Sequence, residues 1–243
     1  MKYFMTGDFH THTVHSHGEG TIRDNVLAAR NKGLREIAIT DHGPGNQENG
    51  ISRASVPEMR KIVTALNEEF DDITIHLGVE ANINSKGNCL DVAPEEFDDF
   101  DFVIAGYHYG IDNGYCLENW KDFYKGYNSR ELMMRNTQMA LTAIYENNIR
   151  ILTHPGDKAN FDMLELARAC AETDTWMEIS TSHATLNVRQ IKLCAKTDVK
   201  FVISSDAHMP SRVGSFEGGL RRALEAGLDP ERIVNIERGE KDA

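Results

Sequence analysis

Two histidines near the start of the chain, His10 and His12, are separated by a single residue. In an extended segment this spacing points both imidazole rings to the same side. Imidazole nitrogens are common ligands of zinc, iron and manganese, so the pair could bind a metal ion. Short motifs of this kind also arise by chance. The weight of the pair therefore depends on ligand-type residues elsewhere in the chain.

Similar residues follow several other short apolar segments. Of the ten histidines, seven come after segments that we expect to be strands, and a glutamate and an aspartate occupy equivalent positions. Each residue alone would also suit a polar turn, but packing gives no reason for so many of them at successive strand ends. The predicted metal ligands are His10, His12, His17, His42, Glu80, His108, His154, Asp206 and His208.

Short strand-like segments alternate with helical patterns along the chain, which is typical of βα units around a parallel sheet. In a barrel of such units all strand C-termini open onto one face, so residues far apart in sequence converge there. We expect a helix over 21–33, with Thr21 as its cap and Gly33 at its left-handed end, and another that begins near Pro57. Further helices are expected over 130–147, 161–172, 185–197 and 216–226. The expected strands are 3–5, 36–40, 73–79, 102–105, 150–153, 176–179 and 201–204.

The predicted ligands are more numerous than one ion needs. If each ion takes four or five donors and carboxylates are shared, the set indicates two or three divalent metal ions. Such multinuclear sites bind the oxygens of phosphoryl groups. Imidazole and carboxylate without thiolate suit zinc, iron or manganese. The cysteines support this choice, because Cys89, Cys116, Cys170 and Cys194 form no CxxC pair and are expected to be reduced thiols.

Composition limits the class of protein. A chain of 243 residues with 40% apolar residues suits one domain over 1–243. A net charge of −12 disfavours nucleic acid as a partner, while bound cations would still allow a small phosphorylated substrate. The chain turns polar too soon for a secretory signal and has no membrane-spanning apolar run, so we expect a cytoplasmic protein. The oligomeric state is not indicated.

The motifs HTHTVHSHGEGT, TDHGP, GVEAN, AGYH, THPG and SDAH together resemble the polymerase and histidinol phosphatase (PHP) superfamily, above all its small stand-alone phosphatases. The resemblance runs from His10 to His208. It implies an α/β fold, a distorted (β/α)7 TIM-like barrel, with a trinuclear site. It further implies three ligand sets, which are His10, His12, Glu80 and Asp206 for one ion, His17, His42 and His208 for a second, and Glu80, His108 and His154 for the third.

The motif HTHTVHSHG leaves a choice between His15 and His17 for the third early ligand. The ligand of the family follows a serine, which favours His17. His15 is then expected on the pocket wall or beside the ligands. Asp8 and Asp41 precede ligand histidines and could accept their second ring proton, although capping of local turns explains them equally well.

Three more residues are candidates for substrate binding. Arg212 lies just after the SDAH motif, and Arg53 lies in the segment after TDHGP. Either guanidinium could bind a phosphate by paired hydrogen bonds. His183 follows the sixth expected strand and could contact substrate, although a solvated loop histidine is equally plausible.

The expected function is metal-dependent hydrolysis of a phosphomonoester by a metal-activated water, with Glu80 and Asp206 as the catalytic residues. Asp206 or a neighbouring histidine could move the proton of the leaving group. Three alternatives remain. A histidinol-phosphate phosphatase would differ only in substrate. An exonuclease on single-stranded nucleic acid is disfavoured by the acidic composition, and a noncatalytic metal-binding domain is disfavoured by the complete ligand set.

Overall fold

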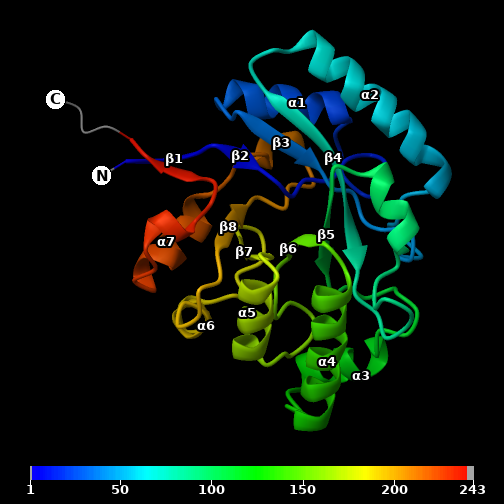
Figure 1. The fold of residues 1–243 in the computed structure, drawn as a ribbon, viewed down its shortest axis with the longest axis vertical. Helices are drawn as coiled ribbons and strands as arrows, with labels where there is room; N and C mark the ends of the chain where they lie inside the picture. Colours follow the sequence, from blue (N-terminus) through cyan, green and yellow to red (C-terminus); the bar gives the residue numbers. More distant parts are fainter. Residues whose placement is uncertain (1, 240–243) are drawn as a thin grey trace.

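Seven parallel strands form a nearly closed barrel at the centre of the molecule (Figure 1). The computed structural model describes residues 2–239. Neighbouring strands follow one another in chain order, and each pair is parallel, as right-handed βα units require. The strands are β2 (Gly7–Asp8), β3 (Glu36–Ile39), β4 (Thr74–Asn82), β5 (Phe102–Gly106), β6 (Ile149–Leu152), β7 (Trp176–Ser180) and β8 (Phe201–Ser204).

The first and last strands of the barrel, β2 and β8, are joined by the side chain of Asn235. Its amide nitrogen donates to the carbonyl oxygens of Gly7 at 2.7 Å and Ile203 at 2.6 Å, and its oxygen accepts from the backbone nitrogen of Ile203 at 3.1 Å. Beyond the strand ends, the backbone nitrogen of His12 donates to the carbonyl of Ala207 at 2.8 Å. The buried side chain of Asn235 therefore connects the first and last strands of the barrel by hydrogen bonds.

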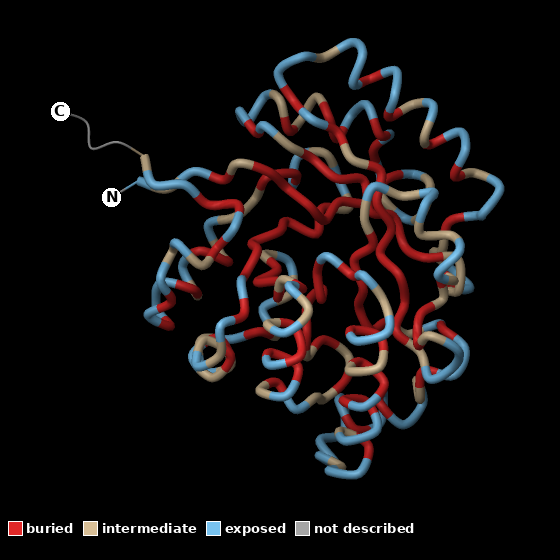
Figure 2. Tube along the Cα trace, in the orientation of Figure 1, coloured by how far each residue is buried: buried red, intermediate tan, exposed pale blue. Residues whose placement is uncertain are grey.

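Helices surround the barrel and expose their outer faces, while the strands are buried (Figure 2). The expected caps of the first helix are confirmed, because Thr21 and Asp24 form a capping box and Gly33 has φ +74°. None of the helices within residues 2–239 combines the length and apolar composition needed to cross a bilayer. The helices are α1 (Ile22–Asn31), α2 (Val56–Glu69), α3 (Cys116–Lys125), α4 (Arg130–Glu146), α5 (Met163–Glu172), α6 (Val188–Cys194) and α7 (Glu217–Glu225), with 3-10 turns η1 (Arg53–Ser55), η2 (Pro94–Asp99), η3 (Pro210–Arg212) and η4 (Pro230–Arg232).

The strand expected over 3–5 is present with these bounds, but it was wrongly assigned to the barrel. Residues Tyr3–Met5 form β1, which pairs antiparallel with β9 (Ile236–Arg238) outside the barrel. The first barrel strand is β2, only two residues long. The sequence around Gly7 and Asp8 carries no apolar run, and the pairing of β1 with a segment more than 200 residues away depends on the closed fold. Helix α3 was also missed, because its exposed aromatic residues obscure the helical pattern.

The interior of the barrel is filled below the strand C-termini by apolar side chains. One buried cluster consists of Phe9, Ala38, Ile104, Ile151 and Val202, each from a different part of the barrel wall. Such layers of alternating side chains make the interior a packed core rather than a pore. This core is the floor of the site described next.

Candidate metal centre

The carboxylate of Glu80 lies at the centre of the site and is fully buried. Its Oε2 atom is 2.9 Å from Nδ1 of His42 and 3.3 Å from Nε2 of His10. Its Oε1 atom is 2.9 Å from Nε2 of His154 and 3.4 Å from Nε2 of His108. These four histidines follow four different strands. The expected convergence of strand-end residues on one face of the barrel is therefore present.

Asp206 provides a second buried carboxylate, after β8. Its Oδ1 atom is 3.2 Å from Nε2 of His12 and 3.6 Å from both Nε2 of His10 and Nδ1 of His208. The backbone of Asp206 has φ +51°, and that of His154 has φ +25°. Left-handed backbone at residues other than glycine is strained, and such strain is concentrated at functional sites.

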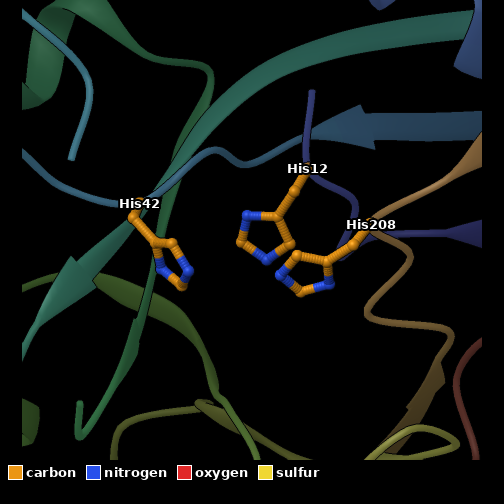
Figure 3. Close-up of side chains that lie close together, drawn as sticks. All are labelled: His12, His42 and His208. Carbon is orange, nitrogen blue, oxygen red and sulfur yellow. The ribbon is translucent and has the colours of Figure 1, made fainter. Parts of the chain in front are cut away.

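Four imidazoles gather at the open end of the cluster. Figure 3 shows His12, His42 and His208 pointing toward one another from three separate segments. The ring centroids of His12 and His208 are 4.3 Å apart, and those of His12 and His42 are 4.4 Å apart. His17 joins this group, with its ring centroid 4.2 Å from that of His208 and 4.9 Å from that of His42.

Several buried polar atoms of this cluster form no hydrogen bond of acceptable geometry, although some lie close to a carboxylate or imidazole neighbour. They include Nδ1 of His12, Nδ1 of His42, Oε2 of Glu80 and both ring nitrogens of His108. Burying such atoms without partners costs about 1–3 kcal/mol each, so the fold retains them for another purpose. The residues of the cluster form four groups of three in which the potential ligand atoms all lie within 4.8 Å of one another. These groups are His12, His42 and His208; His10, Glu80 and His154; His10, His12 and Asp206; and His42, Glu80 and His108.

Partial desolvation and the neighbouring His208 and His42 lower the pKa of His17 to about 4, although this residue is exposed. Burial lowers the pKa of His108 to about 3, with His42 acting in the same direction. These imidazoles are thus neutral at neutral pH and keep a lone pair for a cation. Burial by itself would raise the pKa of Glu80, but the charges and hydrogen bonds of His10 and His108 together outweigh burial and hold that pKa well below its usual range. The carboxylate is therefore ionised. The site combines neutral nitrogen donors with charged oxygen donors.

A second glutamate inside the barrel was missed by the sequence reasoning. Glu178, on β7, is fully buried and accepts a 2.6 Å hydrogen bond from the backbone nitrogen of His154. Its other oxygen is 2.8 Å from Nδ1 of His10. An acidic residue within an otherwise apolar strand was the available signal. Glu178 fixes the His10 ring so that Nε2 faces the other ligands, the usual role of a carboxylate behind a metal-binding histidine.

Asp8 and Asp41 do not act in this way. The carboxylate of Asp8 accepts from the backbone nitrogens of Ser205 at 3.1 Å and Gly214 at 2.7 Å. That of Asp41 accepts from the backbone nitrogen and the hydroxyl of Thr13, both at 2.7 Å. Their oxygens bind chain segments rather than ring nitrogens. Both aspartates thus hold loops beside the site. This is the second of the two roles expected from the sequence, the capping of local turns.

The structure does not bring every predicted site residue into the pocket. Arg53 is ion-paired with Glu96 and lies at another, smaller cleft, so it is not placed to bind substrate. Arg212 is exposed on η3 and does not line the histidine pocket, and neither does His15. His183 does line it, with Nε2 3.1 Å from Oδ2 of Asp206.

The pocket above the cluster has a volume of about 620 Å³. Its inner end consists of predicted ligands, which are His17, His42, His108, His154, Asp206 and His208. Its rim is formed by Asn46, Glu48, Asn49, Tyr109, Gly110, Lys158 and His183. The rim residues come from loops that follow β3, β5, β6 and β7. A ligand that reaches the histidines must contact this rim.

Known proteins resemble this chain over nearly its whole length. The chain is 29% identical over 239 residues to the probable phosphatase YcdX of Escherichia coli K12. This match covers 94% of this chain and 89% of YcdX. It is 31% identical over 238 residues to a probable phosphatase of Syntrophotalea carbinolica, covering 94% of this chain and 90% of that protein.

A solved structure with a similar fold is the histidinol phosphate phosphatase of Lactococcus lactis, complexed with zinc, L-histidinol and phosphate. The TM-score is 0.64 at 18% identity, over 93% of this chain and 95% of that one. This likeness confirms the barrel fold. The family model of the PHP domain matches residues 8–183. The resemblance read from the histidine motifs is thus confirmed, and the chain belongs to the PHP domain family.

Proposed function

We propose that this PHP-family chain is a metal-dependent phosphatase that hydrolyses small phosphomonoesters, with residues 1–243 acting as one catalytic domain. One observation carries the proposal. A single buried carboxylate, Glu80, has five imidazoles within 4 Å of its two oxygens. Such an arrangement is costly unless cations occupy it, and a multinuclear cation site suits the transfer of phosphoryl groups.

The donor chemistry fits two or three divalent ions such as zinc, iron or manganese. Glu80 belongs to two of the donor sets and Asp206 to another, so we infer that the carboxylate of Glu80 is shared between two ions. We propose His10, His12, Glu80 and Asp206 for one ion. His17, His42 and His208 would hold a second, and Glu80, His108 and His154 a third. When bound, the ions supply positive charge for phosphoryl oxygens and lower the pKa of a nearby water.

The chain itself supplies orientation for this chemistry. The hydroxyl of Thr153, the residue directly after β6, donates to Oε1 of Glu80 at 2.6 Å and fixes the central carboxylate. Glu178 fixes His10 from β7. Oδ2 of Asp206 faces the pocket side, where it meets His183 rather than the ligand histidines. This second oxygen is placed to accept a proton from an attacking water or pass one to the leaving group.

Metal analysis and a substrate panel on the same sample test the proposal. Protein purified without chelator is expected to contain two or three ions per chain and to release phosphate from p-nitrophenyl phosphate. Glu80→Ala and Asp206→Ala should abolish turnover and reduce metal content without changing the far-UV circular dichroism. Glu225→Ala, at an exposed position on α7, serves as the matched control. Full activity in either site variant would refute the proposal.

The same panel separates the alternative functions. L-histidinol phosphate belongs in it because the Lactococcus lactis enzyme of similar fold acts on that class of ester. Single-stranded DNA tests for nuclease activity, for which the net charge of −12 is unfavourable. Metal-loaded protein that leaves every ester intact would indicate a noncatalytic metal-binding domain.

A further inference from the structure

Lys158 is the one lysine or arginine among the described residues that line the histidine pocket. The two arginines expected to bind an anionic substrate, Arg53 and Arg212, lie outside it. An ammonium has three hydrogen-bond donors. Among the described residues, its one ion-pair partner is the carboxylate of Asp157, at 2.8 Å. The side chain is 29% exposed, so it remains accessible from the pocket.

The backbone holds this lysine in a fixed and strained conformation. Lys158 has φ +61°, in the left-handed region that side chains other than glycine rarely adopt. The hydroxyl of Tyr109, another rim residue, donates to the carbonyl of Lys158 at 2.8 Å. Strain of this kind costs on the order of 1–3 kcal/mol and persists where the surrounding structure imposes it for a functional reason.

The contacts of Lys158 also connect it to the predicted metal ligands through two intervening residues. Its partner Asp157 is 3.3 Å from Nδ1 of His183, and Nε2 of that histidine is 3.1 Å from Asp206. From the ligands outward, the order is thus Asp206, His183, Asp157 and Lys158. A phosphoryl group bound at the inner end places its leaving group toward the rim. Lys158 is placed to meet that leaving group.

We propose that Lys158 is a specificity-determining residue that binds an anionic group, a carboxylate or a second phosphate, on the leaving part of the substrate. The inference rests on the phosphatase function proposed above. Glu48 is the other charged rim residue, but it is exposed, and the described residues give its carboxylate no bonding partner. Lys158 is held four residues after the ligand His154, so its position relative to the reacting group is the better defined one.

Matched pairs of substrates that differ in one anionic group test this inference on the metal-loaded protein. The first pair is 3-phosphoglycerate and glycerol 3-phosphate, which differ by a carboxylate against a hydroxymethyl group. The second is 1,3-propanediol bisphosphate and its monophosphate. In at least one pair, the anionic member should have a kcat/KM about tenfold higher, as one charge-assisted hydrogen bond provides. Lys158→Met should remove this preference and leave the neutral member within about threefold of wild type.

Several measurements keep the result interpretable. Lys192→Met, at an exposed position on α6 outside the pocket, is the control variant. Metal content and melting temperature show whether Lys158→Met remains intact, and Lys158→Arg should retain most of the preference. In the unmodified protein, free glycerate should inhibit hydrolysis of p-nitrophenyl phosphate about tenfold more strongly than glycerol, which requires no variant.

The possible failures differ in meaning. If metal-loaded wild type hydrolyses p-nitrophenyl phosphate but shows no preference in either pair, the role of Lys158 is refuted and the phosphatase function stands. Equal loss for both members in Lys158→Met would also refute it, and so would a preference for phosphoethanolamine over ethyl phosphate, which would point to Glu48. If no ester is hydrolysed, both proposals fail.

Discussion

The carboxylate of Glu178 lies 2.8 Å from Nδ1 of His10, at full burial, and its other oxygen accepts the backbone N–H of His154. One side chain on β7 therefore orients two of the predicted ligands. His10 and His154 follow β2 and β6, so this contact ties three parts of the barrel wall together. The ligand geometry depends on a residue outside the ligand motifs.

Replacing Glu178 should weaken metal binding more than it disturbs the fold. In Glu178→Gln the amide can accept one of the two hydrogen bonds but not both, so the His10 ring loses its fixed orientation. Metal affinity is expected to fall about 10- to 100-fold, as for other carboxylates behind metal-binding histidines. Competition with a chromophoric chelator measures this change. Glu165→Gln, on the exposed face of α5, is the control, and unchanged affinity in Glu178→Gln would contradict the assigned role.

Removal of metal should destabilise the protein. The cluster places several unpartnered donors and two carboxylates together in a buried space, and ions that bind only the folded state stabilise it by mass action. The melting temperature of chelator-treated protein is expected to rise by about 5 °C or more when zinc or manganese is restored in excess. Differential scanning calorimetry measures this shift. An unchanged melting temperature would argue against a resident ion at this site.

The metal-free protein should lose stability as the pH falls from 6.5 toward 4. Partial desolvation beside His208 and His42 lowers the pKa of His17 to about 4 in the folded state, from 6.5 in the unfolded chain. Between these values the unfolded chain binds more protons at this position, so the free energy of unfolding decreases with decreasing pH. His10 acts in the opposite direction, since nearby carboxylates raise its pKa in spite of burial.

A His17→Asn variant separates these two contributions. It lacks the proton uptake at position 17, so its free energy of unfolding should fall less than that of wild type over the same range. Urea denaturation of chelator-treated samples at pH 7, 5.5 and 4.5 gives the two curves. Parallel curves would show that His17 does not have the lowered pKa.

Asn235 should be important for the stability of the barrel. Its buried side chain forms one hydrogen bond with Gly7 of β2 and two with Ile203 of β8. Asn235→Ala leaves those backbone groups without partners and should lower the free energy of unfolding by about 2–4 kcal/mol. Asn31→Ala, at the exposed last residue of α1, is the comparison, and chemical denaturation measures both. A change below about 0.5 kcal/mol in Asn235→Ala would mean that the barrel does not depend on this bridge.

The sequence by itself determined the alternation of strands and helices and the types of residue at the strand ends. Periodicity and capping are local properties, so the helix over 21–33 and its caps at Thr21 and Gly33 were predictable from neighbouring residues. The choice of His17 over His15 came from the motif alone. The structure brings His17, and not His15, to the other imidazoles.

Only the tertiary structure decided which side chains act together. The pairing of β1 with β9, the bridge made by Asn235 and the support of His10 by Glu178 each join residues more than 150 positions apart. Contacts of this kind follow from closure of the barrel, and no local pattern records them. The same holds for the two arginines, since their distance from the pocket is set by how the loops fold. The strand ends meet at one face because the strands are parallel. Which side chains contact one another at that face is decided by the closed barrel.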